Sequence, residues 1–363
     1  MTAPQQPSPE PQPIVTPLRT AAIFLVLTID PGGEDTVRGL LEDVSALQRS
    51  VGFRLPEGEL SAVAAIGSDA WDRLFSGPRP AELHPFRELQ GAKHRAIATP
   101  GDLLFHLRAN QMGLCFEYAT QVMNRLAGYV TVQDEVHGFR YFDERDLMGF
   151  VDGTESPAGR AGEAAALVGP EDPDFTGGSY VMVQKYLHDM DSWNALTTEE
   201  QERVIGRHKL SDIEIPYELK APDSHVALNT IEDADGNERK ILRSNMPFGS
   251  PGSQEFGTYY IGYAASLSVT EQMLQNMFIG DPPGNTDRIL DFSTAITGTQ
   301  FFAPSADFLD DLPDPPAPAA LAADDDAGSL PSQPEPAQPP EPPVTPDPSG
   351  SLGIGSLKRS TPQ

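Results

Sequence analysis

The segment GFVDGTESP, residues 149–157, is the most distinctive candidate for chemistry in this 363-residue chain. Two glycines flank Asp152 and permit a tight turn, and the preceding Phe-Val pair suits the edge of an apolar pocket. A carboxylate held at such an edge can accept a proton and return it. The alternative is a glycine-rich surface turn in which Asp152 only caps the backbone.

Seven histidines are the other candidates for acid–base or metal chemistry. Six have structural explanations in strand-like runs, in polar loops or at a helix end, where a cation is stabilised: His106, His188, His84, His94, His137 and His208. His225 differs because it follows a Pro-Asp-Ser turn and lies 18 residues before Arg243 in KILRSNMPFG. A metal ligand and a structural histidine both remain compatible with this pattern.

The elements that would position these residues alternate between strand-like and helix-like patterns from about residue 19 to 302. Strands are predicted over residues 20–29, 103–108, 180–187 and 258–265, and helices over 33–51, 115–126, 191–206 and 270–278. The repeated rhythm predicts an α+β fold made of duplicated ferredoxin-like units. A doubly wound α/β sheet is the alternative that the pattern leaves open.

Composition excludes several classes of function. The chain has 53 acidic and 25 basic residues, a formal net charge of −28, which opposes binding to nucleic acid or to an anionic membrane. Its single cysteine, Cys115, cannot form an internal disulfide. Residues 1–18 have no basic residue to begin a signal peptide, and the longest apolar run, 21–29, is too short to span a bilayer. We expect a cytoplasmic protein.

Proline and acidic residues gather near the C-terminus. Residues 311–350 contain 13 of the 36 prolines and eight acidic residues, without Lys, Arg or an aromatic residue. Such a segment cannot bury enough apolar area to fold. We predict disorder over residues 1–18 and a disordered linker over 303–348, with two folded halves at 19–150 and 151–302. The final segment, 349–363, contains SGSLGIGSLKRS, which suits either a tethered docking peptide or a frayed terminus.

Five segments taken together carry a family resemblance: GFVDGTESP, GRHK, SHVALN, ILRSNMPFG and NTDRILDF, in that order. The body of the chain, from about residue 20 to 302, resembles the dye-decolourising peroxidases, and GFVDG with the downstream arginine is most similar to their bacterial B-type branch. The resemblance implies a duplicated ferredoxin-like α+β barrel with one haem b per subunit in the C-terminal half. This agrees with the repeat seen in the pattern of elements.

The resemblance also implies roles for individual residues. His225 matches the proximal iron ligand, and Asp287 matches the acid that hydrogen-bonds its other ring nitrogen. Asp152 and Arg243 match the distal residues, with Asn245 beside them, and Arg207 matches the residue that pairs with a haem propionate. The implied activity is reduction of hydrogen peroxide through a ferryl porphyrin-radical intermediate, with oxidation of dyes, phenolic or lignin-related compounds. A haem-binding or deferrochelatase-like iron-releasing protein on the same fold is the alternative.

The C-terminal segment is similar to the cargo-loading peptide that directs such enzymes into encapsulin nanocompartments. The matching residues are Leu352, Gly353, Ile354, Gly355, Ser356 and Leu357. Alternating glycines would let the backbone lie flat in a groove while the aliphatic side chains fill pockets. The resemblance further implies a homo-oligomer, either a dimer or a trimer of dimers.

Overall fold

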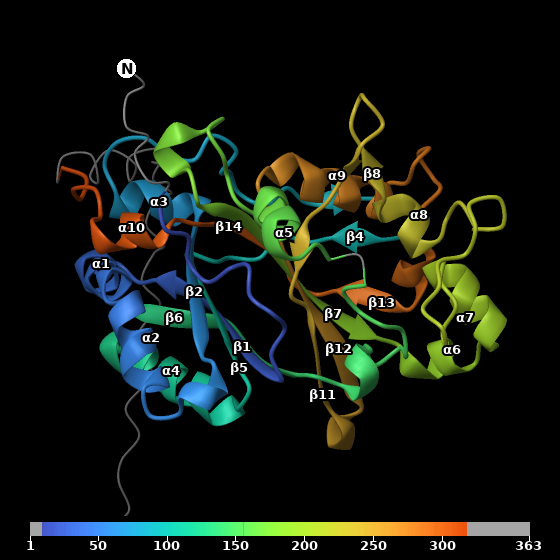
Figure 1. Ribbon diagram of the computed structural model, residues 1–363, viewed down its shortest axis with the longest axis horizontal. Coiled ribbons are helices and arrows are strands. Elements are labelled where there is room, and N and C mark those ends of the chain that lie inside the picture. Colours follow the sequence, from blue (N-terminus) through green and yellow to red (C-terminus); the bar gives the residue numbers. More distant parts are fainter. Residues whose placement is uncertain (1–8, 155, 318–363) are drawn as a thin grey trace, which may run out of the picture. The chain divides into compact units, whose positions relative to one another are not determined.

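The computed structural model describes residues 9–154 and 156–317, and its main feature is a ten-stranded sheet (Figure 1). Each half of the chain contributes four principal strands, and both sets have the same order. The first half gives β2-β5-β1-β6, from β1 (Ala21–Ile29), β2 (Ser61–Gly67), β5 (Leu103–Ala109) and β6 (Val130–Phe139). The second gives β11-β12-β7-β14, from β7 (Ser179–His188), β11 (Met246–Ser250), β12 (Glu255–Ala264) and β14 (Thr299–Ala303).

The two halves meet along both ends of the sheet. Strand β14 pairs with β2 through Phe301 with Gly67 and Phe302 with Ile66. At the other end β6 approaches β11 so closely that a Cβ on Gly138 would lie 2.5 Å from Cβ of Met246. The sheet therefore closes into a barrel, and Gly138 is needed at the second contact because a side chain there would separate the strands.

Alternation along the strands supplies an apolar barrel interior and an apolar outer face. Ala22, Phe24 and Val26 of β1 point into the barrel, whereas Ile23, Leu25, Leu27 and Ile29 pack under the helices. The covering helices of the first half are α1 (Glu34–Glu42), α2 (Val44–Gly52), α3 (Ser68–Leu74) and α4 (Met112–Arg125). The predicted helix over 33–51 is thus two helices that meet at Asp43, a break that the continuous apolar spacing does not reveal.

The second half has shorter helices around its sheet. They are α5 (Gly159–Ala166), α6 (Met190–Asn194), α7 (Thr198–Ile205), α8 (His225–Asn229), α9 (Leu267–Phe278) and α10 (Ala306–Asp310). The predicted helix over 191–206 is divided into α6 and α7, because Thr197 forms a capping box with Glu200 that starts α7. Smaller strands complete the fold: β3 (Leu89–Gln90), β4 (Arg95–Ala96), β8 (Ile231–Glu232), β9 (Glu238–Arg239), β10 (Leu242–Arg243) and β13 (Ser293–Ala295).

The prediction of disorder was wrong for residues 9–18. Ile14 is fully buried, and the side chain of Gln12 bonds to both the N–H and the carbonyl of Ala64 on β2, at 2.8 Å each. Gln12 also donates to the carbonyl of Pro304 at 2.8 Å. The segment is ordered because its amide side chain satisfies backbone groups that β14 leaves unpaired.

The predicted linker also begins too early, since residues 303–317 belong to the fold. Leu309 of α10 is buried, and the ring of Phe308 lies 5.6 Å from that of Trp71. The proline-rich composition begins only at residue 311, after the end of α10. Residues 1–8 and 318–363, including the predicted docking peptide, lie outside the described residues.

The α+β duplicated ferredoxin-like fold is confirmed, and the doubly wound alternative is wrong because every strand pair described is antiparallel. The predicted boundary at residue 150 falls in the connection between β6 and β7. No helix within the described residues is long and apolar enough to cross a bilayer.

Candidate active site

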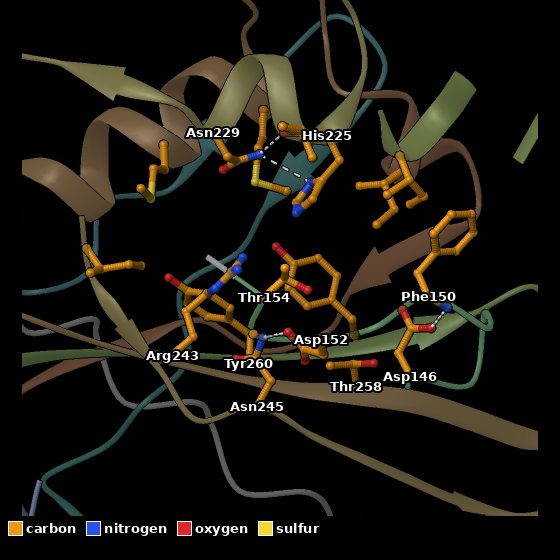
Figure 2. A pocket seen from close by; sticks show the side chains of 18 of the residues that line it. Asp146, Phe150, Asp152, Thr154, His225, Asn229, Arg243, Asn245, Thr258 and Tyr260 are labelled. Atoms are coloured by element: carbon orange, nitrogen blue, oxygen red, sulfur yellow. Dashed lines mark hydrogen bonds between the residues drawn. The ribbon is translucent and has the colours of Figure 1, made fainter. Parts of the chain in front are cut away.

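A pocket in the second half lies between helices α8 and α9 on one side and the floor formed by β10, β12 and the segment 144–154 on the other (Figure 2). It brings together residues that are up to about 150 positions apart in the sequence. Its lining includes Asp146, Phe150, Asp152, His188, Arg207, His225, Asn229, Arg243, Asn245, Thr258, Tyr260 and Ser293.

His225 is the first residue of α8 and its ring points into the pocket (Figure 2). Its Nδ1 lies 2.7 Å from Oδ2 of Asp287, a carboxylate that is fully buried. Asp287 is itself held at the start of a short helix, where its Oδ1 accepts from the N–H of Ile289 at 2.9 Å. The pair therefore fixes the imidazole and leaves Nε2 available to a ligand in the pocket.

Asn229, one turn further along α8, holds this pair in place. Its Nδ2 donates to the carbonyl of His225 at 2.8 Å and to Oδ2 of Asp287 at 3.3 Å. The Asp287 carboxylate thus receives hydrogen bonds from two side chains as well as from the backbone. Such support orients a ligating histidine.

Asp152, Asn245 and Arg243 lie opposite His225 across the pocket (Figure 2). Asn245 donates from Nδ2 to Oδ1 of Asp152 at 3.3 Å, and its own Oδ1 accepts from the N–H of Ile261 at 3.0 Å. Because β12 fixes Asn245, the amide in turn orients the carboxylate of Asp152.

Arg243 lies on β10, paired with Gly262 of β12. Its backbone N–H is 3.2 Å from Oγ of Ser156, and among the described residues no hydrogen bond or ion pair engages its guanidinium group. Tyr260 lies beside it on β12, with a hydroxyl whose pKa is raised to about 12 by burial. A positive charge near an orienting amide and a carboxylate is suited to stabilising negative charge that develops in the pocket.

Segment 144–152 is a hairpin that presents two carboxylates to the same pocket. Arg145 bridges to Val151, and the N–H of Asp152 bonds to the carbonyl of Glu144 at 2.9 Å. Asp146 pairs with Phe150: its N–H donates to the Phe150 carbonyl at 2.8 Å, and its Oδ1 accepts from the Phe150 N–H at 2.9 Å. Burial, followed by the negative charge of Asp152, raises the pKa of Asp146 to about 7.

His188 forms part of the pocket wall at the end of β7. Its Nδ1 is 2.8 Å from Oγ of Ser293, and its Nε2 is 2.9 Å from Oγ1 of Thr258. Burial lowers its pKa to about 4. A neutral ring with both nitrogens engaged has the structural role that was expected from its place in a strand.

Arg207 lines the pocket and is only 7% exposed. Its Nη1 donates to the carbonyl of Asp212 at 2.7 Å, and its Nη2 is 3.4 Å from Oε2 of Glu214. The planar guanidinium is thus fixed at the pocket wall by acidic residues of the following loop.

The structure brings together all six residues selected from the body of the chain: Asp152, Arg207, His225, Arg243, Asn245 and Asp287. Four further features of the pocket could not be predicted from the sequence: Asp146, Asn229, Thr258 and the position of His188 in the wall. Asp146 enters the pocket because Asp146, Phe150 and Asp152 share one face of a hairpin, an arrangement that depends on the register of its two arms. In the described part of the chain, no group of three or more His, Cys, Asp or Glu is arranged to hold a metal ion.

A second, smaller cavity of about 30 Å³ lies behind the floor of the pocket. Asp152, Gly153, Arg243 and Asn245 line both cavities, so they form the wall between them. The far side of the small cavity is formed by Leu18, Arg19, Arg140, Tyr141, Glu144, Arg145, Met246 and Pro247. This volume suits a molecule the size of water or peroxide.

Comparison with known proteins identifies both halves of the chain. The N-terminal domain model of Dyp-type peroxidase matches residues 11–140, and the C-terminal domain model matches residues 143–308. A dye-decolorizing peroxidase of Rhodococcus erythropolis is 64% identical over 353 residues, 97% of this chain and 98% of that protein.

Solved structures agree with this relationship. The encapsulated DyP-type peroxidase from Mycobacterium smegmatis has a TM-score of 0.84 and 66% identity, covering 85% of this chain and 100% of that chain. A variant of Rhodococcus jostii DypB in complex with haem has a TM-score of 0.82 and 54% identity, covering 84% and 99% respectively.

Proposed function

Because the chain belongs to the Dyp-type peroxidase family, we propose that its pocket binds haem b and that the protein reduces hydrogen peroxide while oxidising dyes and other small aromatic compounds. The observation that carries this proposal is the arrangement across one pocket of His225, held by Asp287, opposite Asp152, Asn245 and Arg243. A proximal ligand and a distal acid–base pair are what peroxide cleavage at haem requires.

The residues present fit the cofactor. His225 offers Nε2 to the pocket while Nδ1 is occupied by Asp287, which is the usual arrangement of a histidine that binds haem iron. Arg207 would pair with a propionate, supported by its position in the wall and its fixed planar group. When bound, haem would supply the redox chemistry that no side chain in the pocket provides.

The distal residues would handle the proton and the charge. Asp152 takes a proton from one peroxide oxygen and returns it to the other, so that the leaving oxygen departs as water. Arg243 stabilises the negative charge that develops on that oxygen, and Asn245 holds the Asp152 carboxylate in position. The cavity behind them, with its volume of about 30 Å³, supports a route for peroxide.

An absorption spectrum tests the proposal directly. The purified protein with haem should show a strong Soret band that changes within one turnover after one equivalent of peroxide is added. The band should then return to its starting form as a dye is oxidised. A protein that binds haem but shows no change with peroxide would refute the proposed activity, and one without a Soret band would refute haem binding.

We further propose that the protein is packaged in an encapsulin shell through residues 349–363. The support is the encapsulated relative from Mycobacterium smegmatis together with the LGIGSL motif at residues 352–357. Deletion of residues 349–363 should abolish co-purification with a co-expressed shell protein and leave peroxidase activity unchanged. Loading by the truncated chain would contradict the docking role.

A homo-oligomer is proposed from apolar side chains on one exposed loop. Leu210, Ile213, Tyr217 and Leu219 are 91%, 64%, 88% and 77% exposed. Exposed apolar residues gathered in this way are characteristic of protein interfaces. Light scattering should report a dimer or a trimer of dimers for the native chain, and Leu210→Ser with Tyr217→Ser should reduce the mass. An unchanged mass would place the interface elsewhere.

A further inference from the structure

Asp146 is a carboxylate on the distal side of the pocket to which the proposed mechanism assigns no role. It stands opposite Phe150 in the hairpin, and Asp152 stands two residues beyond Phe150. Cross-strand partners and alternate residues share a face, so the side chains of Asp146 and Asp152 project from the same side of the hairpin. Both line the pocket, and Thr258 is drawn between them on its floor (Figure 2).

Among the described residues no hydrogen bond or ion pair joins Asp146 to a cation, although the positive charge of Lys209 interacts with it electrostatically. Phe150 stands opposite Asp146 in the hairpin, and the Phe150 ring packs on the indole of Trp193, 6.1 Å apart between ring centres. Lys209 is the nearest lysine, but its Nζ bonds to Oε1 of Gln201 at 2.6 Å and lies 5.5 Å from the centre of the Phe150 ring. Arg145 donates to the carbonyls of Gly149 and Lys209. The hydrogen bonds of both cations therefore go to other groups, while Asp146 accepts from the backbone of its own turn and lines the pocket.

The charged and titratable groups around Asp146 come from four elements. They are Arg145 and Asp152 on the hairpin, Lys209 after α7, His188 on β7 and His225 across the pocket. His188 stays neutral at physiological pH because its pKa is about 4, and Asp152 contributes a negative charge. The balance favours the protonated form of Asp146, and burial with this charge raises its pKa to about 7.

Reduction of peroxide consumes protons that a single carboxylate cannot supply. Hydrogen peroxide, two electrons and two protons give two molecules of water, while Asp152 only moves a proton from one oxygen to the other. The electrons come from the aromatic reductants, and the two additional protons must enter the pocket from solvent. A second group that holds a proton near neutral pH would meet this need.

We propose that Asp146 is the proton reserve of the distal side: it gives a proton through pocket water to the carboxylate of Asp152 and is reprotonated from solvent. Asp146 acts through Asp152 and does not touch the reacting oxygens, so its effect on the reaction is indirect. The inference rests on the proposed peroxidase function.

Substitutions can distinguish proton transfer by Asp146 from a purely structural role. As the turn partner of Phe150 it needs only one acceptor oxygen, which an asparagine also provides. Asp146→Asn therefore retains the turn and removes the proton. Asp143→Asn is the matched control, since Asp143 lies on the same segment, is exposed and adopts a left-handed conformation that asparagine tolerates.

Infrared titration without peroxide tests the protonation itself. The native haem-loaded protein should show a carboxylic acid carbonyl band that disappears with a midpoint near pH 7, as expected for Asp146. The band should be lost in Asp146→Asn and kept in Asp143→Asn. Asp152→Asn should move the midpoint to lower pH, because it removes the negative charge that raises the pKa of Asp146. Persistence of the band in Asp146→Asn, or an unchanged midpoint in Asp152→Asn, would overturn the proposal.

Transient kinetics tests the transfer. After the peroxide-driven spectral change, the return to the starting spectrum with a dye should slow in the native protein as pH rises through about 7. In Asp146→Asn this dependence should vanish and the return at pH 6 should be about tenfold slower, with Asp146→Glu restoring most of both. A native pH profile in Asp146→Asn would refute the relay. Absence of any change with peroxide in the native protein would refute the peroxidase function, while leaving the infrared result intact.

Discussion

The two halves of the molecule share a strand order, but the outer faces of their first strands, β1 and β7, carry different kinds of residues. In the first half β1 turns Ile23, Leu25, Leu27 and Ile29 toward the helices, and all are buried in one apolar cluster. At the corresponding positions β7 presents Gln184, Tyr186 and His188 to the pocket. The same frame thus carries a packed apolar layer in one half and one wall of the pocket in the other.

The connection that follows the first strand explains this difference. In the first half it forms α1 and α2, whose Val37, Leu40, Leu41, Val44 and Leu47 pack on the sheet. In the second half it forms α6 and α7, whose buried residues pack with Phe150 and Phe292 in a separate cluster: Trp193, Val204 and Ile205. These helices stand away from β7, and the uncovered sheet face becomes a wall of the pocket. A duplicated fold can therefore form a pocket in one half when the helices that follow its first strand do not pack on the sheet.

Removal of the proximal histidine should give the largest effect if the site belongs to the second half alone. His225→Ala eliminates the nitrogen that Asp287 orients, so the Soret band of the purified protein should be lost or greatly weakened. The control is His137→Ala, an exposed histidine of the first half, which should retain the native spectrum. A normal Soret band in His225→Ala would remove this residue as the ligand.

Substitution of the distal residues should give the second-largest effect. Asp152→Ala and Arg243→Leu should keep haem but slow the peroxide-driven spectral change by about 10²–10³-fold, because each removes either the proton carrier or the stabilising charge. Stopped-flow absorbance measures the rate, and their ratio shows which residue contributes more. Asp35→Asn, an exposed carboxylate on α1, should react at the native rate. Native rates in both pocket variants would show that the distal assignment is wrong.

Substitutions in the packed face of the first half should instead change the free energy of unfolding. Leu25→Ala should lower the free energy of unfolding by about 2–5 kcal/mol, because Leu25 is 1% exposed and leaves a cavity beneath the helices. The corresponding change Gln184→Ala borders an existing pocket and should cost less. Urea denaturation followed by circular dichroism would compare them. Equal losses would mean that the two faces contribute alike to stability.

A smaller effect should appear in the dependence of stability on pH. Burial followed by the charge of Arg108 lowers the pKa of His106 well below 6.5 in the folded protein. The unfolded chain therefore binds a proton as pH falls through 6.5 while the folded chain does not, so the free energy of unfolding decreases. From pH 7 to 5 the contribution of His106 is roughly 2 kcal/mol. His106→Gln should reduce the difference between urea unfolding at the two pH values, and an unreduced difference would contradict the assignment.

Four of the eight principal strands, β1, β5, β7 and β12, could be predicted from the sequence because buried β runs such as residues 20–29 are continuous and apolar. The other four, β2, β6, β11 and β14, were not predicted. Helix boundaries were less accessible. The apolar spacing of 33–51 continues across Asp43, although the chain turns there. The ordered residues 9–15 could not be predicted either, because Gln12 is fixed by backbone groups of β2 that are more than 50 positions away.

The residues of the site likewise differ in how far the sequence alone indicates them. Asp152 is conspicuous because of its flanking glycines, whereas His225, Asp287 and Arg243 were assigned through a family resemblance and not through spacing. Asp146 and His188 carry no local signal, since their position in the pocket depends on the register of a hairpin and on the face of β7. Such residues become visible only when distant segments are placed together.

The seam between β2 and β14 has a consequence for synthesis on the ribosome. The strand that completes β2 is made about 240 residues later, which at cellular rates of elongation is a delay of roughly 10 to 50 seconds. During that time an open strand edge would invite pairing with another nascent chain. Gln12 precedes β2 in the chain and bonds to Ala64 on this same edge. The N-terminal segment can therefore cover the edge of β2 long before β14, the strand that finally pairs with it, has been translated.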